Sequence, residues 1–342
     1  MESSRLPLLL TASISTRGMK GACFSDTERE AMYLAALKWY LENLPEDQPI
    51  VFAENSGWDL SAFADLVRVN SSSSSSSNLQ TFEPFSRRVL EPAPYRHSHT
   101  RTFEPSNVKP QTSNVSRIEW ISVDPAICDQ SRGKGYNEIL LMNEAVARSE
   151  TIKKAGAFMK VTGRYPIFNL AHYLAAAEKF FAKGGAYYGD MKDHKLYDWL
   201  HTGWNGHAAY TVLFASTVEF YQAHLAGSYV DCNDYTDNWI ECVWFRILKR
   251  LRTPTPHSSL PTPHTPLPTT NYHLPSTIYH LPSTNYQLPS LSLRFDREPI
   301  CGGLQGSQLD AASFNQNNES MRARVQRFGG NMIRIFTPWF WF

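Results

Sequence analysis

The sequence has few cysteines and no excess of charge of either sign. Its 342 residues include five cysteines, none of them in a C-x-x-C pair, and this pattern predicts reduced thiols rather than a disulfide framework. Lysine and arginine number 33 against 32 acidic residues, which gives a net charge of +1. Nothing in this balance favours nucleic acid or an anionic membrane surface as a partner. We therefore expect no nucleic-acid partner and a cytoplasmic location.

Long hydrophobic runs are also missing. The apolar stretch at residues 6–10 is far shorter than a membrane-spanning helix and short even for the core of a signal peptide. We interpret it as the start of the first strand. The aromatic segment 337–342 is likewise too short to cross a bilayer, and packing on the core is the favoured interpretation. The sequence predicts no transmembrane segment.

Two stretches of low complexity interrupt the chain. Seven consecutive serines occupy residues 71–77, and the surrounding segment, 69–116, is rich in Ser and Pro without apolar periodicity. In residues 252–293 a Tyr-x-Leu-Pro-Ser unit recurs every seven residues, beginning at Tyr272, Tyr279 and Tyr286. Frequent prolines forbid a continuous helix or a central strand, so both segments are predicted to be disordered insertions without a part in the chemistry. A Pro-rich ligand for a partner protein is the alternative for the second segment.

The remaining segments, 1–68 and 117–251 continued by 294–342, predict one α/β domain with a mostly parallel sheet flanked by helices. Apolar, strand-like runs alternate there with amphipathic helices. Strands are expected near residues 8–14, 49–53, 118–123, 157–161, 186–189 and 211–215. Helices are expected at 170–181 and 239–251, at 138–149, after strand 211–215 to about 225, and from an N-cap at Asp26. Ligands of such sheets bind beyond the carboxyl ends of the strands, so polar residues there are the first functional candidates.

Common nucleotide-binding and hydrolase motifs are absent. Cys128 stands where a Walker loop needs its first glycine, and Gly135 stands where that loop has Ser or Thr. Glu138 occupies the place of the third glycine of a dinucleotide fingerprint. Glu54 stands where a nucleophile elbow around Ser56 would need glycine. The sequence therefore has neither a P-loop nor a dinucleotide fingerprint, and we do not expect Ser56 to act as a nucleophile.

Three clusters combine glycine with polar or cationic side chains near predicted strand ends. Glycine lets the backbone approach a ligand, Arg and Lys neutralise a diphosphate, and Asn or Glu can bond a base or ribose. The clusters are Glu54, Asn55, Ser56 and Gly57; Arg132, Gly133, Lys134 and Gly135; and Lys160, Thr162, Gly163 and Arg164. Together they predict an anionic, nucleotide-like ligand. A simple turn at Glu54 or Lys160 and a solvated loop at Arg132 are the alternatives.

These motifs, in this order, resemble a family of bacterial glycosyltransferases of lipopolysaccharide and capsule synthesis, which are similar to nucleotide-sugar transferases of GT-A fold. The resemblance covers residues 8–68 and 118–249, with a fainter echo at 299–303, and it breaks at both low-complexity segments. It implies a GT-A-like, Rossmann-like domain that takes a sugar from a nucleoside-diphosphate sugar to a hydroxyl acceptor, expected to be a glycan. Glu54 and Asn55 would contact the base or ribose, and Arg132 and Lys134 the diphosphate.

GT-A enzymes carry a D-x-D motif that binds a divalent cation, whereas this chain has Lys160 to Arg164 at that place. Cations there could support the leaving diphosphate directly. No residue is therefore assigned as a metal ligand, and a need for Mg²⁺ or Mn²⁺ stays open.

Transfer with inversion needs a carboxylate base near the acceptor, and the candidates are Asp190, Asp193 and Glu241. Helix caps or surface charges are the alternative role for these acids. The family pattern has an acid and an arginine where this chain has residues 210–212, and a histidine at Cys242. A catalytically inactive protein that binds a nucleotide or glycan is thus the rival hypothesis. We expect the aromatic residues Trp239, Trp244 and Phe245 to lie in the core.

Overall fold

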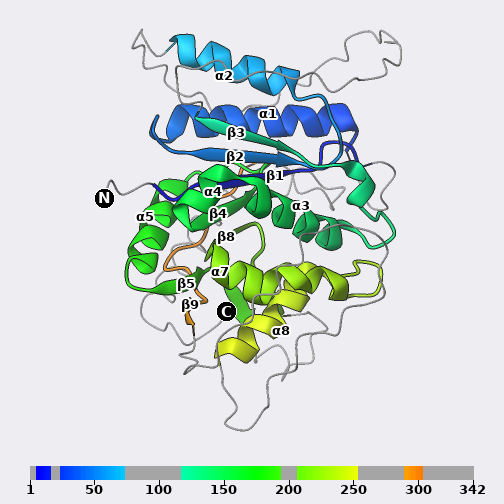
Figure 1. Ribbon diagram of the computed structural model, residues 1–342, viewed down its shortest axis with the longest axis vertical. Coiled ribbons are helices and arrows are strands. Elements are labelled where there is room, and N and C mark those ends of the chain that lie inside the picture. Colours follow the sequence, from blue (N-terminus) through cyan, green and yellow to red (C-terminus); the bar gives the residue numbers. More distant parts are fainter. Residues whose placement is uncertain (1–4, 17–23, 74–116, 194–205, 253–288, 303–342) are drawn as a thin grey trace, which may run out of the picture.

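A seven-stranded sheet forms the centre of the protein (Figure 1). The computed structural model describes residues 5–16, 24–73, 117–193, 206–252 and 289–302, so most of both predicted insertions lies outside the described residues. The strand order is β3-β2-β1-β4-β8-β5-β9. The strands are β1 (Leu8–Ala12), β2 (Ile50–Glu54), β3 (Ile118–Ser122), β4 (Ala157–Thr162), β5 (Gly185–Tyr188), β8 (Leu213–Thr217) and β9 (Ser290–Ser292).

All of these strands except β8 run in one direction. Strands β1 to β4 pair in parallel, β8 is antiparallel to both β4 and β5, and β5 pairs in parallel with β9. A separate antiparallel pair consists of β6 (Met191–Asp193) and β7 (His207–Ala209). The expected mostly parallel α/β sheet is confirmed. Because the chain runs outward from β1 through β2 to β3 and then returns to β4, the topological switch point lies between β1 and β4.

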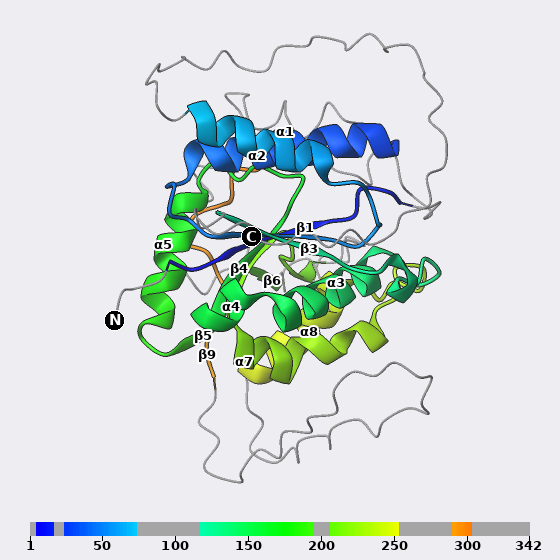
Figure 2. The ribbon, with the colours of Figure 1, turned by 45° about the horizontal axis from the view of Figure 1, so that its top comes forward.

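Helices cover both faces of the sheet (Figure 2). One face packs on α1 (Asp26–Asn43), α2 (Ser61–Ser73) and α5 (Leu170–Phe181). The other packs on α3 (Lys134–Arg148), α4 (Glu150–Ala155), α7 (Val218–Phe220) and α8 (Ile240–Arg252). Strand β1 begins with three leucines because both of its faces are buried. Leu8 and Leu10 belong to the core on one face, and Leu9 belongs to the core on the other. A strand buried on both faces has no polar alternation.

Short helical segments connect some of the longer elements. A 3-10 helix spans Pro125–Ile127, a π-helical segment spans Tyr221–Leu225 and a second 3-10 helix spans Ala226–Asp231. The helix expected after the strand 211–215 is therefore broken into three turns of different type. That strand is itself β8, which begins two residues later than expected, at Leu213.

Local capping moves two predicted helix starts. The N-cap of α1 is Ser25 rather than Asp26, because Ser25 and Glu28 form a capping box in which each side chain accepts from the other's backbone N–H. Helix α3 begins at Lys134, one turn before the expected Glu138, and Asp234 supplies acceptors for its first N–H groups. That partner lies 100 residues away in the sequence.

Each predicted insertion includes residues that belong to a helix or a strand. Helix α2 continues to Ser73, five residues past the expected end of its segment. Strand β9 lies within 252–293 and extends the sheet beside β5. The edge strand matters for the core, because Leu293 and Phe295 directly after it are buried.

Candidate functional site

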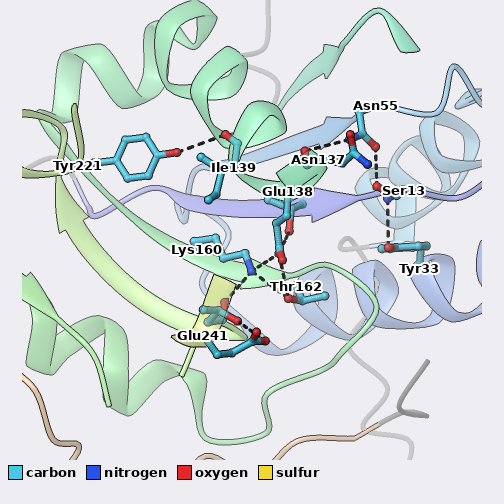
Figure 3. Close-up of polar contacts among 12 residues, drawn as sticks. Ser13, Tyr33, Asn55, Asn137, Glu138, Ile139, Lys160, Thr162, Tyr221 and Glu241 are labelled. Atoms are coloured by element: carbon cyan, nitrogen blue, oxygen red, sulfur yellow. Dashed lines mark hydrogen bonds and ion pairs between the residues drawn. The ribbon is translucent and has the colours of Figure 1, made fainter. Parts of the chain in front are cut away.

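A buried lysine lies at the switch point of the sheet (Figure 3). Lys160 lies in the middle of β4 and shares one face of the strand with Phe158 and Thr162, so its side chain faces the layer of α3 and α8. The side chain has 0% exposure. Its Nζ contacts a carboxylate oxygen of Glu138 and donates to the hydroxyl of Thr162 (3.0 Å) and the carbonyl of Thr211 (2.7 Å). A fully buried ammonium group is thus saturated with oxygen partners.

The carboxylate of Glu138 joins three elements at this point. It projects from the first turns of α3, and besides Lys160 it accepts a hydrogen bond from the hydroxyl of Thr11 at the end of β1 (3.3 Å). Its side chain keeps 22% exposure. Glu138 is therefore an acid that is held by a buried cation and still reaches solvent.

Glu241 adds a second carboxyl group from the start of α8. It accepts from the hydroxyl of Thr211 (3.1 Å), the residue whose carbonyl receives Lys160. Burial raises the pKa of Glu241, and the negative charges of Glu138 and Asp234 act in the same direction. Glu138, Lys160, Thr162, Thr211 and Glu241 are called the Lys160 cluster below.

A chain of hydrogen bonds links the ends of β1 and β2 to α3. The hydroxyl of Ser13 donates to the side-chain oxygen of Asn55 (2.5 Å), and the amide of Asn55 donates to the carbonyl of Asn137 (3.4 Å), the residue before Glu138. The backbone N–H of Ser13 donates to the hydroxyl of Tyr33 on α1 (3.1 Å). The structure thus brings Asn55 to the same sheet edge as the Lys160 cluster, as the sequence predicted.

Glu54 does not present its carboxylate to a ligand. The side chain is buried and accepts backbone N–H groups of Ser56 (2.7 Å), Gly57 (2.9 Å), Trp58 (3.3 Å) and Ile14 (3.2 Å). The Ser56 hydroxyl also contacts it and accepts from the N–H of Ser15 (2.9 Å), while Gly57 turns the chain with φ +68°. This is the turn interpretation left open by the sequence. The expected contact of Glu54 with a base or ribose is corrected to a structural role, because the bonds hold the loops after β1 and β2 together.

Arg132 also has a structural role instead of the expected one. Its guanidinium donates to the carbonyls of Val230 (2.6 Å) and Cys232 (2.9 Å) and stacks on the ring of Tyr136 at 5.1 Å. These contacts tie the loop before α3 to the segment before α8. The expectation that Arg132 faces a diphosphate is therefore corrected.

The N-terminus of α3 is occupied by a carboxylate of the same chain. Asp234 accepts the backbone N–H of Lys134 (2.6 Å) and that of Gly135 (3.3 Å). Gly133 has φ +90°, and a Cβ atom there would lie 2.6 Å from the Cβ of Asp234. Burial raises the pKa of Asp234 while these N–H groups and the charge of Lys134 lower it, with a net increase. Asp234 thus fills the place where the sequence predicted a diphosphate.

The third cluster meets the Lys160 cluster. The N–H of Gly163 donates to the carbonyl of Thr11 (2.9 Å), and a Cβ atom at Gly163 would lie 3.0 Å from that oxygen, so the loop after β4 passes tightly over the end of β1. The guanidinium of Arg164 stacks on the ring of Tyr165 at 4.8 Å. Burial lowers the pKa of Arg164, but Tyr165 and the negative charge of Glu138 outweigh it and raise that pKa.

Of the three predicted catalytic acids, only Glu241 belongs to the Lys160 cluster. Asp193 lies on β6 and pairs with His207 (2.8 Å) and with Lys249 (3.4 Å), which is two turns, or about 12 Å, past Glu241 along α8. Asp190 is buried after β5, and its carbonyl accepts from the N–H of Tyr210 (2.8 Å). The charge of Asp190 adds to burial in raising the pKa of Tyr187. Asp193 is thus an ion-pair partner that joins β6 to β7 and α8, and its catalytic role stays a prediction.

Sequence reasoning missed Glu138, Thr211 and Asp234 as site residues. The sequence spacing could have pointed to Glu138, because it follows Lys134 by one helical turn and therefore lies on the same face of the helix. Thr211 and Asp234 had none, because their partners lie 51 and 100 residues away. Trp239 is also corrected, since it is 43% exposed while Trp244 and Phe245 are buried as expected.

No protein-family model matches this chain, and comparison with curated proteins finds no match either. Within the described ranges, no three His, Cys, Asp or Glu side chains lie together in a way that could hold a metal ion. The described helices include none that is long and apolar enough to span a bilayer.

Proposed function

We propose that this protein is a GT-A-like glycosyltransferase that takes a sugar from a nucleoside-diphosphate sugar to a hydroxyl of a glycan. The observation that carries this proposal is the Lys160 cluster at the switch point between β1 and β4. Open α/β sheets bind their ligands beyond the carboxyl ends of the strands at such a point. Lys160 pairs there with a carboxylate of partial exposure, Glu138, whose negative charge also favours the charged form of Arg164. The resemblance of the three motifs to bacterial lipopolysaccharide and capsule glycosyltransferases supports the same function.

Glu138 is the general base in this proposal. Its carboxylate takes the proton of the acceptor hydroxyl, the acceptor oxygen forms a bond to the anomeric carbon, and the bond from that carbon to the diphosphate oxygen breaks. The electron pair of the broken bond leaves with the nucleoside diphosphate. Lys160 is a positioning residue, since it is fully buried and holds Glu138.

Arg164 and Lys134 are the proposed contacts of the diphosphate. The negative charge of Glu138 favours the charged form of Arg164, and Lys134 lies one turn before Glu138 on α3. A guanidinium group can bind a phosphate with two parallel hydrogen bonds. Asn55, at the end of β2, is the proposed contact of the base or ribose.

A catalytically inactive binding protein is the second candidate, and one observation favours it. Asp234 accepts the backbone N–H groups at the N-terminus of α3 and Arg132 is held by carbonyl groups, so these donors of the second cluster are already satisfied within the chain. Such a protein would bind a nucleotide or glycan without transfer.

The test combines binding with turnover in the full-length protein. We expect nucleoside diphosphates and their sugars to raise the melting temperature of the wild type, and Arg164→Ala to reduce that rise. Arg68→Ala, an exposed arginine paired with Asp65 on α2, is the matched control and should respond as the wild type does. Glu138→Gln should keep nucleotide binding and lose transfer, measured as release of nucleoside diphosphate with an oligosaccharide mixture as acceptor.

Three results separate the possibilities. If the folded wild type is stabilised by no nucleotide or nucleotide sugar, the donor site is refuted. Binding without release of nucleoside diphosphate would favour the inactive alternative. Full transfer by Glu138→Gln would exclude Glu138 as the base.

A further inference from the structure

The loop that leads into α8 is tightly organised and carries two exposed aromatic side chains. Its ends are joined by reciprocal backbone bonds, from Asn233 N–H to Asn238 carbonyl (2.9 Å) and from Asn238 N–H to Asn233 carbonyl (3.1 Å). The N–H of Tyr235 donates to the side-chain oxygen of Asn233 (3.0 Å). Asp237 adopts φ +57°, a left-handed conformation that few non-glycine residues take. Strained backbone in a loop with this many internal bonds often marks a functional position.

A hydrogen bond from the indole N–H orients the Trp239 side chain, which is partly exposed to solvent. The indole N–H donates to the carbonyl of Asp234 (3.1 Å), and the residue is 43% exposed. Tyr235, four residues earlier in the same loop, is also 43% exposed and donates through its hydroxyl to the carbonyl of Gln130 (3.4 Å). An aromatic ring held in one orientation binds a flat apolar surface with little loss of conformational entropy.

The polar groups around these rings match a carbohydrate. A sugar ring has apolar C–H faces, which stack on aromatic rings, and hydroxyl groups at its edge, which bond to carboxylates and amides. Asp231, Thr236 and Asp237 are exposed beside the two aromatic residues. The loop and its contacts hold three aspartates against three cations, Arg132, Lys134 and Arg246, so the formal charges balance. A surface without net charge offers no electrostatic attraction to an anionic glycan and suits a neutral one.

We propose that Trp239, with Tyr235, is a stacking platform for a neutral oligosaccharide. Trp239 precedes Glu241 by two residues, so their Cα atoms lie at most about 7 Å apart. The platform therefore lies close to the Lys160 cluster along the chain, and it is assigned to the acceptor of the proposed transfer. As the acceptor subsite it rests on the proposed function, although binding of the oligosaccharide can be measured without transfer.

The experiment measures oligosaccharide binding to the full-length protein by titration calorimetry and by quenching of tryptophan fluorescence. The neutral probes are oligomers of α-linked glucose, β-linked glucose and N-acetylglucosamine, and the anionic probes are oligogalacturonate and heparin fragments. We expect at least one neutral series to bind, Trp239→Ala to weaken it at least about tenfold, and Tyr235→Ala to weaken it less. Trp239→Phe should restore part of the affinity. Phe168→Ala removes an aromatic residue that is 51% exposed elsewhere and should change nothing.

Failure of the platform and failure of the proposed donor site give different results. Nucleotide-induced stabilisation should persist in Trp239→Ala, which also shows that the variant is folded. Binding that depends on Trp239, in a protein that no nucleotide stabilises, would support the platform and refute the donor site. The platform is refuted if no neutral series binds, if Trp239→Ala binds as tightly as the wild type, or if the anionic probes bind more tightly than the neutral ones.

Discussion

Replacing Lys160 by methionine tests the energetics of the site directly. Methionine is unbranched and fills nearly the same volume, so the substitution removes the charge without opening a cavity. It leaves the carboxylate of Glu138 and the carbonyl of Thr211 without the ammonium group that both now contact. Breaking a buried ion pair on one side costs about 3–5 kcal/mol. Since Glu138 is 22% exposed and water can reach it, we expect the lower end, about 3 kcal/mol.

The measurement is urea-induced unfolding of the wild type and the variant at pH 7, followed by circular dichroism. The dependence of the free energy of unfolding on urea concentration is compared between the two proteins. The matched control is Lys153→Met, because Lys153 forms an exposed ion pair with Glu150 at 2.8 Å. Exposed pairs contribute about 0–1 kcal/mol, so the control should change the free energy of unfolding by no more than that.

A double variant identifies the source of the loss. Glu138→Gln removes the stranded negative charge, so Lys160→Met with Glu138→Gln should be more stable than Lys160→Met alone by about 1 kcal/mol or more. The reasoning is refuted if Lys160→Met and Lys153→Met destabilise the protein equally. It is also refuted if adding Glu138→Gln makes the loss larger.

Three further predictions concern single positions, and each is measured by the same unfolding assay. Gly133→Ala should cost about 2 kcal/mol more than Gly156→Ala, because both glycines have positive φ but only Gly133 has a side chain, Asp234, in the way; equal losses would contradict this. Burial raises the pKa of Glu241, so the folded state holds that proton to higher pH than the unfolded state does, and wild-type stability falls as pH rises from about 4.5 through the raised pKa. Glu241→Gln should therefore be more stable than the wild type at pH 7, with a smaller advantage at pH 4, and a difference independent of pH would refute it. Glu54→Gln should lower the free energy of unfolding by about 2–3 kcal/mol, because the amide nitrogen of glutamine would face backbone N–H groups that now donate to a carboxylate oxygen. A loss below about 1 kcal/mol would contradict the structural role of Glu54.

The sheet was predictable from the sequence where burial on both faces makes a strand apolar throughout. Strands β1, β2 and β4 lie within one residue of their predicted starts for this reason, and β3, which is only partly buried, begins at its predicted residue as well. Strands β6, β7 and β9 have three residues each and no apolar run, so no periodicity could indicate them. Their pairing depends on partners that tertiary contacts bring to the edge.

The location of the site was predictable, but the roles of its residues were not. The polar clusters after β2 and β4 meet at the carboxyl edge because parallel strands end on the same side. Whether a side chain in such a cluster is available depends on its neighbours. Glu54 accepts four N–H groups, and Arg132 is held by carbonyls about 100 residues away in the sequence, which composition and spacing do not reveal.

The position of Lys160 argues that the cluster serves binding or catalysis rather than stability. Lys160 pairs with Leu9 on one side and Phe214 on the other, and its neighbours on the same face of β4 include Phe158. An apolar residue would continue that surface without the free energy needed to remove an ammonium group from water. Natural sequences break a local packing rule of this kind mainly at functional sites. Because the exception falls at the switch point and orients a partly exposed carboxylate, the buried charge of Lys160 agrees with the role proposed for Glu138.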